Sequence, residues 1–195
     1  MMNMVKRLIV LLLMCAMVVL TAACAVPAAT SVDQADGLDS ASAWPFTFST
    51  VSLSGEEITE SAFAKNKLTI LNVFATWCPP CVAELPDLGL VAAEYAGKGV
   101  QLVGLLEDGV VATTGKPDDK VIEQANTLLA NAKAEYLVIL PDAALREKFF
   151  ASLQYVPTTF FLDETGTVVE TLIGSRSAEE WANQIDAVLA KLGSK

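Results

Sequence analysis

Two hydrophobic periods alternate along this chain, one typical of buried strands and one typical of amphipathic helices. Largely apolar runs cover residues 68–74, 100–106 and 136–140, and each predicts a buried strand. Apolar positions at helical spacing cover residues 82–96, 121–132 and 181–192. Strands that alternate with helices favour an α/β sheet with right-handed crossovers.

Weaker patterns fill the intervals between these elements. Alternation in residues 46–53, followed by a turn and residues 58–59, predicts an N-terminal hairpin, and residues 142–153 read as a helix. Residues 158–162 and 167–173 predict a second hairpin, with Gly166 at a positive φ. Further short signals are a helical turn at residues 61–67 and a capping box formed by Ser177 and Glu180.

The N-terminal segment has a different character from the rest of the chain. Two basic residues precede an unbroken apolar run, residues 8–20, and the first acidic residue is Asp33. Residues 1–23 therefore read as a signal segment. Cys24 follows small residues, as at the lipobox where a bacterial lipoprotein is cut and acylated, although Thr21 stands where that motif prefers Leu. We expect a lipid anchor, and the alternatives are an uncleaved N-terminal membrane anchor or plain secretion.

Residues 24–43 are rich in Ala, Ser, Thr, Asp, Gln, Gly and Pro, which is typical of a tether. The folded domain is expected to cover residues 44–195. The whole chain has 195 residues, of which 53% are hydrophobic, and this is enough for the core of one domain.

The net charge of −10 narrows the range of partners. Loss of residues 1–23 would leave 11 basic against 23 acidic residues. An acidic body repels phosphate backbones and anionic lipid headgroups. We therefore expect no nucleic-acid binding, and any membrane contact must come from the N-terminal anchor.

Candidate chemistry lies at the end of the first buried run, where Cys78 and Cys81 are expected on the first turn of a helix. Two cysteines at this spacing can close a small disulfide ring, and the free N–H groups and dipole of the helix stabilise a thiolate on Cys78. Pro79 fits the first helical position, which has no N–H to lose. Cys78 is thus the expected nucleophile, and Cys81, one turn further in, the resolving thiol.

Two other interpretations of this pair are weaker. A zinc site needs four ligands, but the chain has no histidine and only two other cysteines, both near the N-terminus. A purely structural disulfide over so short a ring would constrain the unfolded chain little. Redox chemistry is therefore favoured, with no metal and no cofactor expected. Cys15 lies in the apolar run and would be removed with the signal segment, which leaves Cys24 over, and acylation would account for it.

The residues around the pair also carry a family resemblance. The segment NVFATWCPPCVAELP at residues 72–86 resembles the active-site segment of thioredoxin-fold proteins, most closely the extracytoplasmic, membrane-anchored TlpA/ResA-type thiol–disulfide oxidoreductases. VPTT at residues 156–159 is similar to that family's cis-proline loop. The likeness covers residues 44–195. It implies a thioredoxin-like fold, with a central mixed β-sheet flanked by helices and an N-terminal β-hairpin extension.

The resemblance also implies roles for individual residues. From its position alone, Pro157 is only a proline that opens a strand. In the resembling family this proline is cis and packs opposite the cysteines, so the Val156 backbone would hold a substrate by strand addition. Trp77 would cover one side of the pair, and Trp77, Pro79, Pro80 and Val156 are the expected substrate contacts.

Glu84, one helical turn beyond Cys81, has two interpretations. Most glutamates in helices are solvated. The resembling proteins carry a glutamate here, where partial burial would raise its pKa and let it exchange protons with the cysteines. Cytoplasmic thioredoxins place a titratable aspartate where this chain has Asn72, which makes Glu84 the remaining candidate proton carrier.

The expected function is that of an extracytoplasmic, membrane-tethered thiol–disulfide oxidoreductase. It would reduce or exchange protein disulfides, in cytochrome maturation or oxidative-stress repair, with a membrane-embedded dithiol donor as partner. A peroxiredoxin-like thiol peroxidase is the enzymatic alternative, for which Thr76 is suggestive but Trp77 and Cys81 are not. A non-catalytic thioredoxin-fold binding module is the other alternative, and a copper chaperone would want a histidine.

Overall fold

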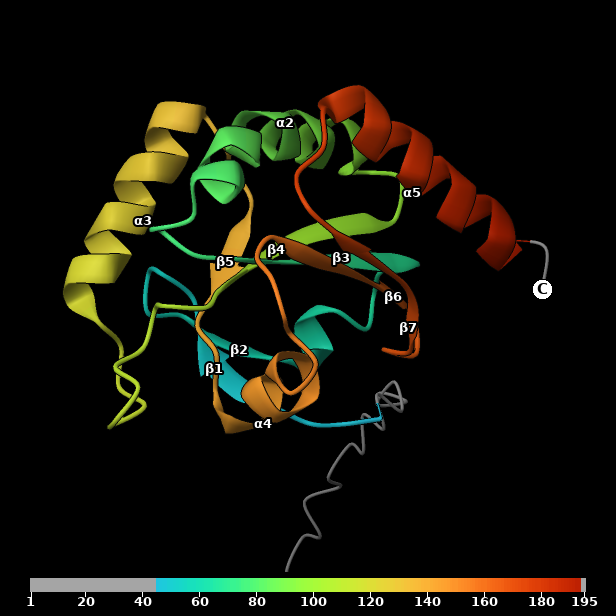
Figure 1. Cartoon of the computed structure of the whole chain (residues 1–195). Helices are drawn as coiled ribbons and strands as arrows, with labels where there is room; N and C mark the ends of the chain where they lie inside the picture. Colours follow the sequence, from blue (N-terminus) through green and yellow to red (C-terminus); the bar gives the residue numbers. More distant parts are fainter. Residues whose placement is uncertain (1–44, 194–195) are drawn as a thin grey trace, which may run out of the picture. The chain divides into compact units, whose positions relative to one another are not determined.

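The computed structural model describes residues 45–193 (Figure 1). The predicted signal segment, the tether, Cys24 and the first residue of the predicted domain all lie outside the described residues, so those boundaries stay predictions. Within the described part of the chain, no helix combines the length and the apolarity needed to cross a bilayer.

A five-stranded mixed sheet forms the centre of the fold, in the order β5-β4-β3-β6-β7. The central strand β3 is buried at every position, which explains why its sequence is apolar along its whole length. It pairs in parallel with β4 and antiparallel with β6. The strands are β3 (Leu68–Phe74), β4 (Val100–Leu106), β5 (Leu137–Ile139), β6 (Thr158–Asp163) and β7 (Val168–Ile173).

Three helices cover one face of this sheet: α2 (Pro79–Tyr95), α3 (Asp119–Ala132) and α5 (Ala178–Gly193) (Figure 1). The other face is covered by the N-terminal hairpin, the 3₁₀ helix that follows it and the short helix α4 (Ala143–Leu145) (Figure 1). The hairpin strands are β1 (Ser49–Val51) and β2 (Glu57–Thr59), and the 3₁₀ helix is η1 (Glu60–Ala62). The predicted thioredoxin-like architecture with an N-terminal hairpin is confirmed.

Local signals in the C-terminal half are also confirmed. Gly166 in the β6–β7 turn has φ +74°. The Ser177 N–H and hydroxyl both donate to the Glu180 carboxylate at 2.9 Å, and the Glu180 N–H donates back to the Ser177 hydroxyl. This is the reciprocal capping box at the start of α5, and it satisfies helix donors that would otherwise lack partners.

The predicted helix over residues 142–153 is wrong in length and type. α4 covers only Ala143–Leu145 and continues as a π-helical turn, η2 (Arg146–Phe150). Leu145 and Phe149 are buried, but Ala151 and Ser152 are exposed, so no further buried turn anchors a longer helix. The chain leaves the helix there and turns towards β6.

Candidate active site

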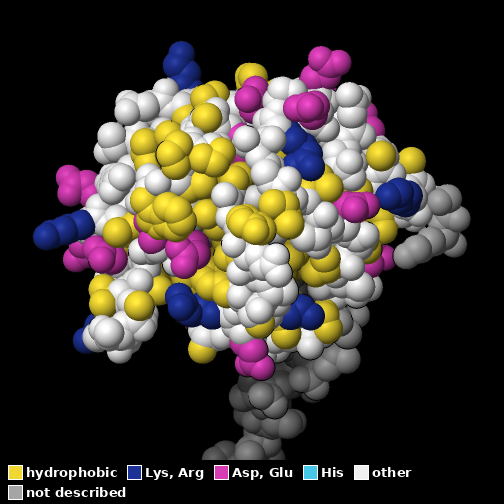
Figure 2. Space-filling model, viewed as in Figure 1, with side chains coloured by type: hydrophobic (Ala, Val, Ile, Leu, Met, Phe, Trp, Pro, Cys, Tyr) yellow, Lys and Arg dark blue, Asp and Glu magenta, His cyan; other side chains and the backbone are white. Residues whose placement is uncertain are grey.

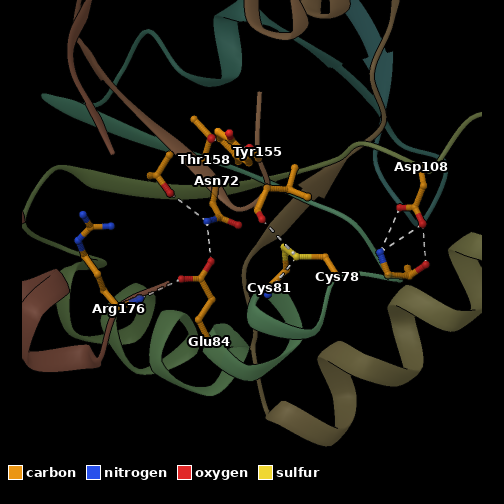
Figure 3. Close-up of a disulfide and its surroundings, with 11 residues drawn as sticks. Asn72, Cys78, Cys81, Glu84, Asp108, Tyr155, Thr158 and Arg176 are labelled. Atoms are coloured by element: carbon orange, nitrogen blue, oxygen red, sulfur yellow. Dashed lines mark hydrogen bonds between the residues drawn. A yellow bond between two sulfur atoms is a disulfide. The ribbon is translucent and has the colours of Figure 1, made fainter. Parts of the chain in front are cut away.

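The disulfide lies where the central strand passes into α2. Cys78 and Cys81 are bonded to each other, with an S–S distance of 2.09 Å (Figure 3). Cys78 is the N-cap of α2, and the Cys81 N–H donates to its sulfur at 3.3 Å. Pro79 and Pro80 occupy the first helical positions, where no N–H is needed. A helix N–H aimed at the Cys78 sulfur would stabilise that sulfur as a thiolate.

Burial hardly distinguishes the two cysteines in this disulfide form. Cys78 is 2% exposed and Cys81 is 0% exposed, so the two side chains hardly differ in solvent accessibility. The helix N–H, which faces the Cys78 sulfur, distinguishes them instead. In the oxidised protein, exposure therefore gives Cys78 almost no advantage over Cys81 as the attacking thiol.

The loop before β6 lies opposite the disulfide. The Val156–Pro157 peptide bond is cis, and the Val156 carbonyl oxygen lies 3.5 Å from the Cys78 sulfur (Figure 3). Pro157 is buried, and its carbonyl accepts from the Gly174 N–H at 2.9 Å. Segments nearly eighty residues apart in the sequence thus meet at one sulfur atom.

Exposed aromatic side chains border this meeting point. Trp77 is 64% exposed and Tyr155 is 65% exposed. Together with Glu107 and residues 153–156 they line a groove of about 330 Å³. Burial and the neighbouring Asp108 raise the pKa of Glu107, and Arg146 opposes them. The side of the molecule shown in Figure 2 displays hydrophobic side chains gathered in patches with acidic side chains among them.

A carboxylate that the sequence interpretation missed braces the active-site turn. The Asp108 carboxylate accepts from the Thr76 N–H at 3.2 Å and from the Thr76 hydroxyl at 2.6 Å (Figure 3). Asp108 follows β4, which runs parallel to β3, so the ends of the two strands meet at the same edge of the sheet. That adjacency is the signal that could have identified Asp108, to which the sequence patterns assign no role.

Glu84 is not a solvated carboxylate. It is 2% exposed, and it accepts from Asn72 Nδ2 at 3.0 Å and from the Arg176 backbone N–H at 3.3 Å (Figure 3). Burial outweighs these stabilising contacts and raises the pKa of Glu84 to about 7. The side chain can therefore gain and lose a proton near neutral pH. Its hydrogen bonds go to Asn72 and Arg176 rather than to the cysteines, which lie one helical turn away.

Within residues 45–193, no group of three or more His, Cys, Asp and Glu side chains is placed to hold a metal ion.

Comparison with known proteins agrees with this geometry. A model of the Redoxin family matches residues 38–189. The thiol-disulfide oxidoreductase ResA of Bacillus cereus is 28% identical over 148 residues, covering 74% of each chain. The sporulation thiol-disulfide oxidoreductase A of Bacillus subtilis is 29% identical over 143 residues, covering 72% of this chain and 80% of that protein. The crystal structure of a thioredoxin-family thiol:disulfide interchange protein from Chlorobium tepidum superposes with a TM-score of 0.60 at 26% identity, covering 72% and 92%.

Proposed function

The chain belongs to the Redoxin family as a thiol–disulfide oxidoreductase of the ResA and DsbE type, and from this premise we propose that it reduces protein disulfides outside the cytoplasmic membrane. One observation carries the proposal. The Cys78 sulfur faces both a helix N–H, which stabilises a thiolate, and the Val156 carbonyl at the edge of an open groove.

The reaction balances as a two-electron exchange. The Cys78 thiolate attacks one sulfur of the substrate disulfide, and the other substrate sulfur leaves as a thiolate and takes up a proton. Cys81 then loses its proton and attacks the Cys78 sulfur, which releases the second substrate sulfur to be protonated. The substrate gains two electrons and two protons, and the enzyme is left with the Cys78–Cys81 disulfide seen here.

Glu84 supplies a proton acceptor for the second step. Residues three apart share a helix face, so Glu84 lies on the same side of α2 as Cys81. A carboxyl group with a pKa of about 7 accepts and returns protons efficiently near neutral pH. We assign Glu84 the task of receiving the Cys81 proton.

The groove beside Cys78 holds the substrate. Val156 and Pro157 present the backbone to an extended peptide, Trp77 lines the same groove as Val156, and the exposed Pro79 and Pro80 follow Cys78 on the helix. The Thr76 hydroxyl is bonded to Asp108 rather than directed at Cys78, which supports disulfide exchange over peroxidase chemistry.

The N-terminal pattern supports a site outside the membrane. Acylation at Cys24 would tether the domain there, and a membrane-embedded dithiol donor would re-reduce it for cytochrome maturation or oxidative-stress repair. Intact mass of the membrane fraction, compared with Cys24→Ser, tests the anchor. A Cys24→Ser protein that is still held in the membrane by an uncut N-terminus would favour a spanning anchor instead.

The exchange reaction is tested by trapping. Cys81→Ser keeps the attacking thiol but removes the resolving one, so it should accumulate mixed disulfides with oxidised substrate proteins, whereas Cys78→Ser should trap almost none. Non-reducing gels and mass spectrometry of the adducts give the result. Stronger trapping by Cys78→Ser than by Cys81→Ser would reverse the assigned roles, and trapping by neither would refute the proposed activity.

A further inference from the structure

Buried polar atoms without a partner gather around Glu84. Among residues 45–193, four buried side-chain polar atoms make no hydrogen bond, and three of them belong to Asn72, Tyr136 and Trp181. Asn72 donates to Glu84 through Nδ2, and Tyr136 feels the charge of Glu84. The Trp181 indole N–H acts on Glu84 as a donor and lowers its pKa, although its geometry falls short of a hydrogen bond, so Asn72 Oδ1 and the Tyr136 hydroxyl are the two atoms that lack any partner here. Leaving a buried polar atom unpaired is costly, so such a cluster calls for a functional explanation.

Tyr136 reaches this cluster across a glycine. Asn72 on β3 lies opposite Gly104 on β4 in the parallel register, so both residues face the same side of the sheet. A Cβ atom at Gly104 would lie 3.3 Å from Tyr136 Cε2. The absence of a side chain at Gly104 therefore lets the Tyr136 ring lie over β4, beside the strand that carries Asn72 and close enough to Glu84 to feel its charge.

The unpaired atoms of Asn72 and Tyr136 are complementary. Asn72 Nδ2 donates to Glu84 and to the Thr159 hydroxyl, each at 3.0 Å, which leaves its Oδ1 as an acceptor without a donor. The Tyr136 hydroxyl is a donor without an acceptor. A hydroxyl can also accept, whereas an amide nitrogen can only donate.

We propose that Tyr136 is a positioning residue for Glu84, acting through Asn72. Its hydroxyl donates to Asn72 Oδ1, through a small rotation or one bridging water, and so holds Nδ2 towards the ionised carboxylate. When Glu84 takes up a proton, the amide turns over: Oδ1 accepts from the carboxyl O–H, and Nδ2 donates to the Tyr136 oxygen. Asn72 and Tyr136 can therefore hydrogen-bond to each other in both protonation states of Glu84. This role rests on the proton transfer proposed for Glu84 above.

The Tyr136 hydroxyl stays protonated, and so remains a hydrogen-bond donor, over the pH range in which Glu84 titrates. Arg176, in the loop before α5, is the cation that acts on Glu84, while β3 and β6 present the neutral Asn72 and Thr159. On α2 itself, the titratable residues nearest to Glu84 in sequence are Cys81 and Asp87, each three positions away, and Cys78. Burial and the charge of Glu84 raise the pKa of Tyr136 well above its usual range, so its hydroxyl keeps its proton at every pH at which Glu84 titrates.

Infrared spectroscopy of the full chain tests this directly. The protonated carboxyl band of Glu84 is the one that disappears in Glu84→Gln, and its pH midpoint is followed in Tyr136→Phe. Loss of the hydroxyl affects both forms, but it weakens the ionised form more, because the hydrogen bond from Asn72 to the carboxylate is charge-assisted. The midpoint should therefore rise by about half to one pH unit. The pH profile of disulfide exchange should move in the same direction.

Tyr95→Phe is the matched control. Tyr95 is a buried residue at the far end of α2 from the disulfide, and its hydroxyl donates to Asp186 at 2.8 Å and to the Ala182 carbonyl at 3.2 Å. Removing it should lower stability more than Tyr136→Phe does and leave the Glu84 midpoint unchanged.

Three results would overturn the proposal: an unchanged midpoint in Tyr136→Phe, an equal shift in Tyr95→Phe, or no carboxyl band that depends on Glu84. Failure of the proposed function is seen separately. The infrared midpoint needs no substrate, whereas disulfide trapping by Cys81→Ser does not depend on the state of Tyr136.

Discussion

The two ends of helix α2 differ in how well their buried polar groups are hydrogen-bonded. At its C-terminal end, Leu88 and Val91 are buried in an apolar core, and the Tyr95 hydroxyl has two hydrogen-bond acceptors. At its N-terminal end lie a disulfide, a buried carboxylate and neighbouring polar atoms that lack partners. One end of the helix is arranged for stability, and the other accepts a loss of stability.

The difference shows that the active-site end of α2 is the part of the helix where folding stability is lost in favour of catalysis. A buried ionisable group that changes charge near neutral pH must have surroundings that tolerate both states, and such surroundings cannot be fully satisfied in either one. The Tyr95 end has no such demand, because its hydroxyl stays neutral. Burial and the neighbouring Asp186 raise the pKa of Tyr95 to about 12.

The largest expected change in folding stability at the active-site end of α2 comes from Glu84→Gln. Burial raises the pKa of Glu84 from 4.5 in the unfolded chain to about 7 in the folded protein. The favourable contribution of this carboxyl is therefore complete below pH 4.5 and lost as the pH rises to 7. Above pH 7 the ionised group should destabilise the folded protein by up to about 3 kcal/mol. Urea unfolding should show Glu84→Gln gaining stability relative to the parent at pH 8 but not at pH 4.

Glu94→Gln is the control from the other end of the same helix. Glu94 is exposed and pairs with Lys98 at 3.3 Å, so its loss should change stability by no more than about 0.5 kcal/mol at either pH. If Glu84→Gln gained nothing between pH 4 and pH 8, the two ends of α2 would not differ in the way described.

A smaller effect is expected at the turn that carries Cys78. Asp108→Ala removes the acceptor of the Thr76 N–H and hydroxyl, which should cost roughly 1–2 kcal/mol of stability and slow disulfide exchange, because the turn before Cys78 loses its brace. Denaturant unfolding and stopped-flow exchange kinetics measure the two effects.

Asp118→Ala loses a comparable interaction away from the site. Its carboxylate caps α3 by accepting from the N–H groups of Lys120 and Val121, and its loss should cost about 1 kcal/mol. Exchange should stay at the parent rate in this variant. Equal slowing in both variants would mean that general destabilisation, and not the brace on Thr76, controls the rate.

Most of the elements could be predicted from local patterns, and the failures have identifiable causes. β3 and the start of α2 follow from an apolar run and two prolines, and both lie where expected. The helix over residues 142–153 was predicted too long, because its periodicity did not reveal that Ala151 and Ser152 would find nothing to pack against. Asp108 was missed because its partner, Thr76, lies 32 residues earlier in the chain.

The sequence by itself determined the chemistry: two cysteines at the start of a helix, a proline before a strand, and a glutamate one turn beyond the cysteines. These depend on local backbone preferences and on spacing, which a linear pattern records. Only the tertiary structure decided that Glu84 is buried, that Val156 faces Cys78, and that Asn72, Gly104 and Tyr136 lie side by side. The reason is physical: pKa values and hydrogen bonds depend on neighbours brought together by the sheet register, and those neighbours are dozens of residues apart in the chain.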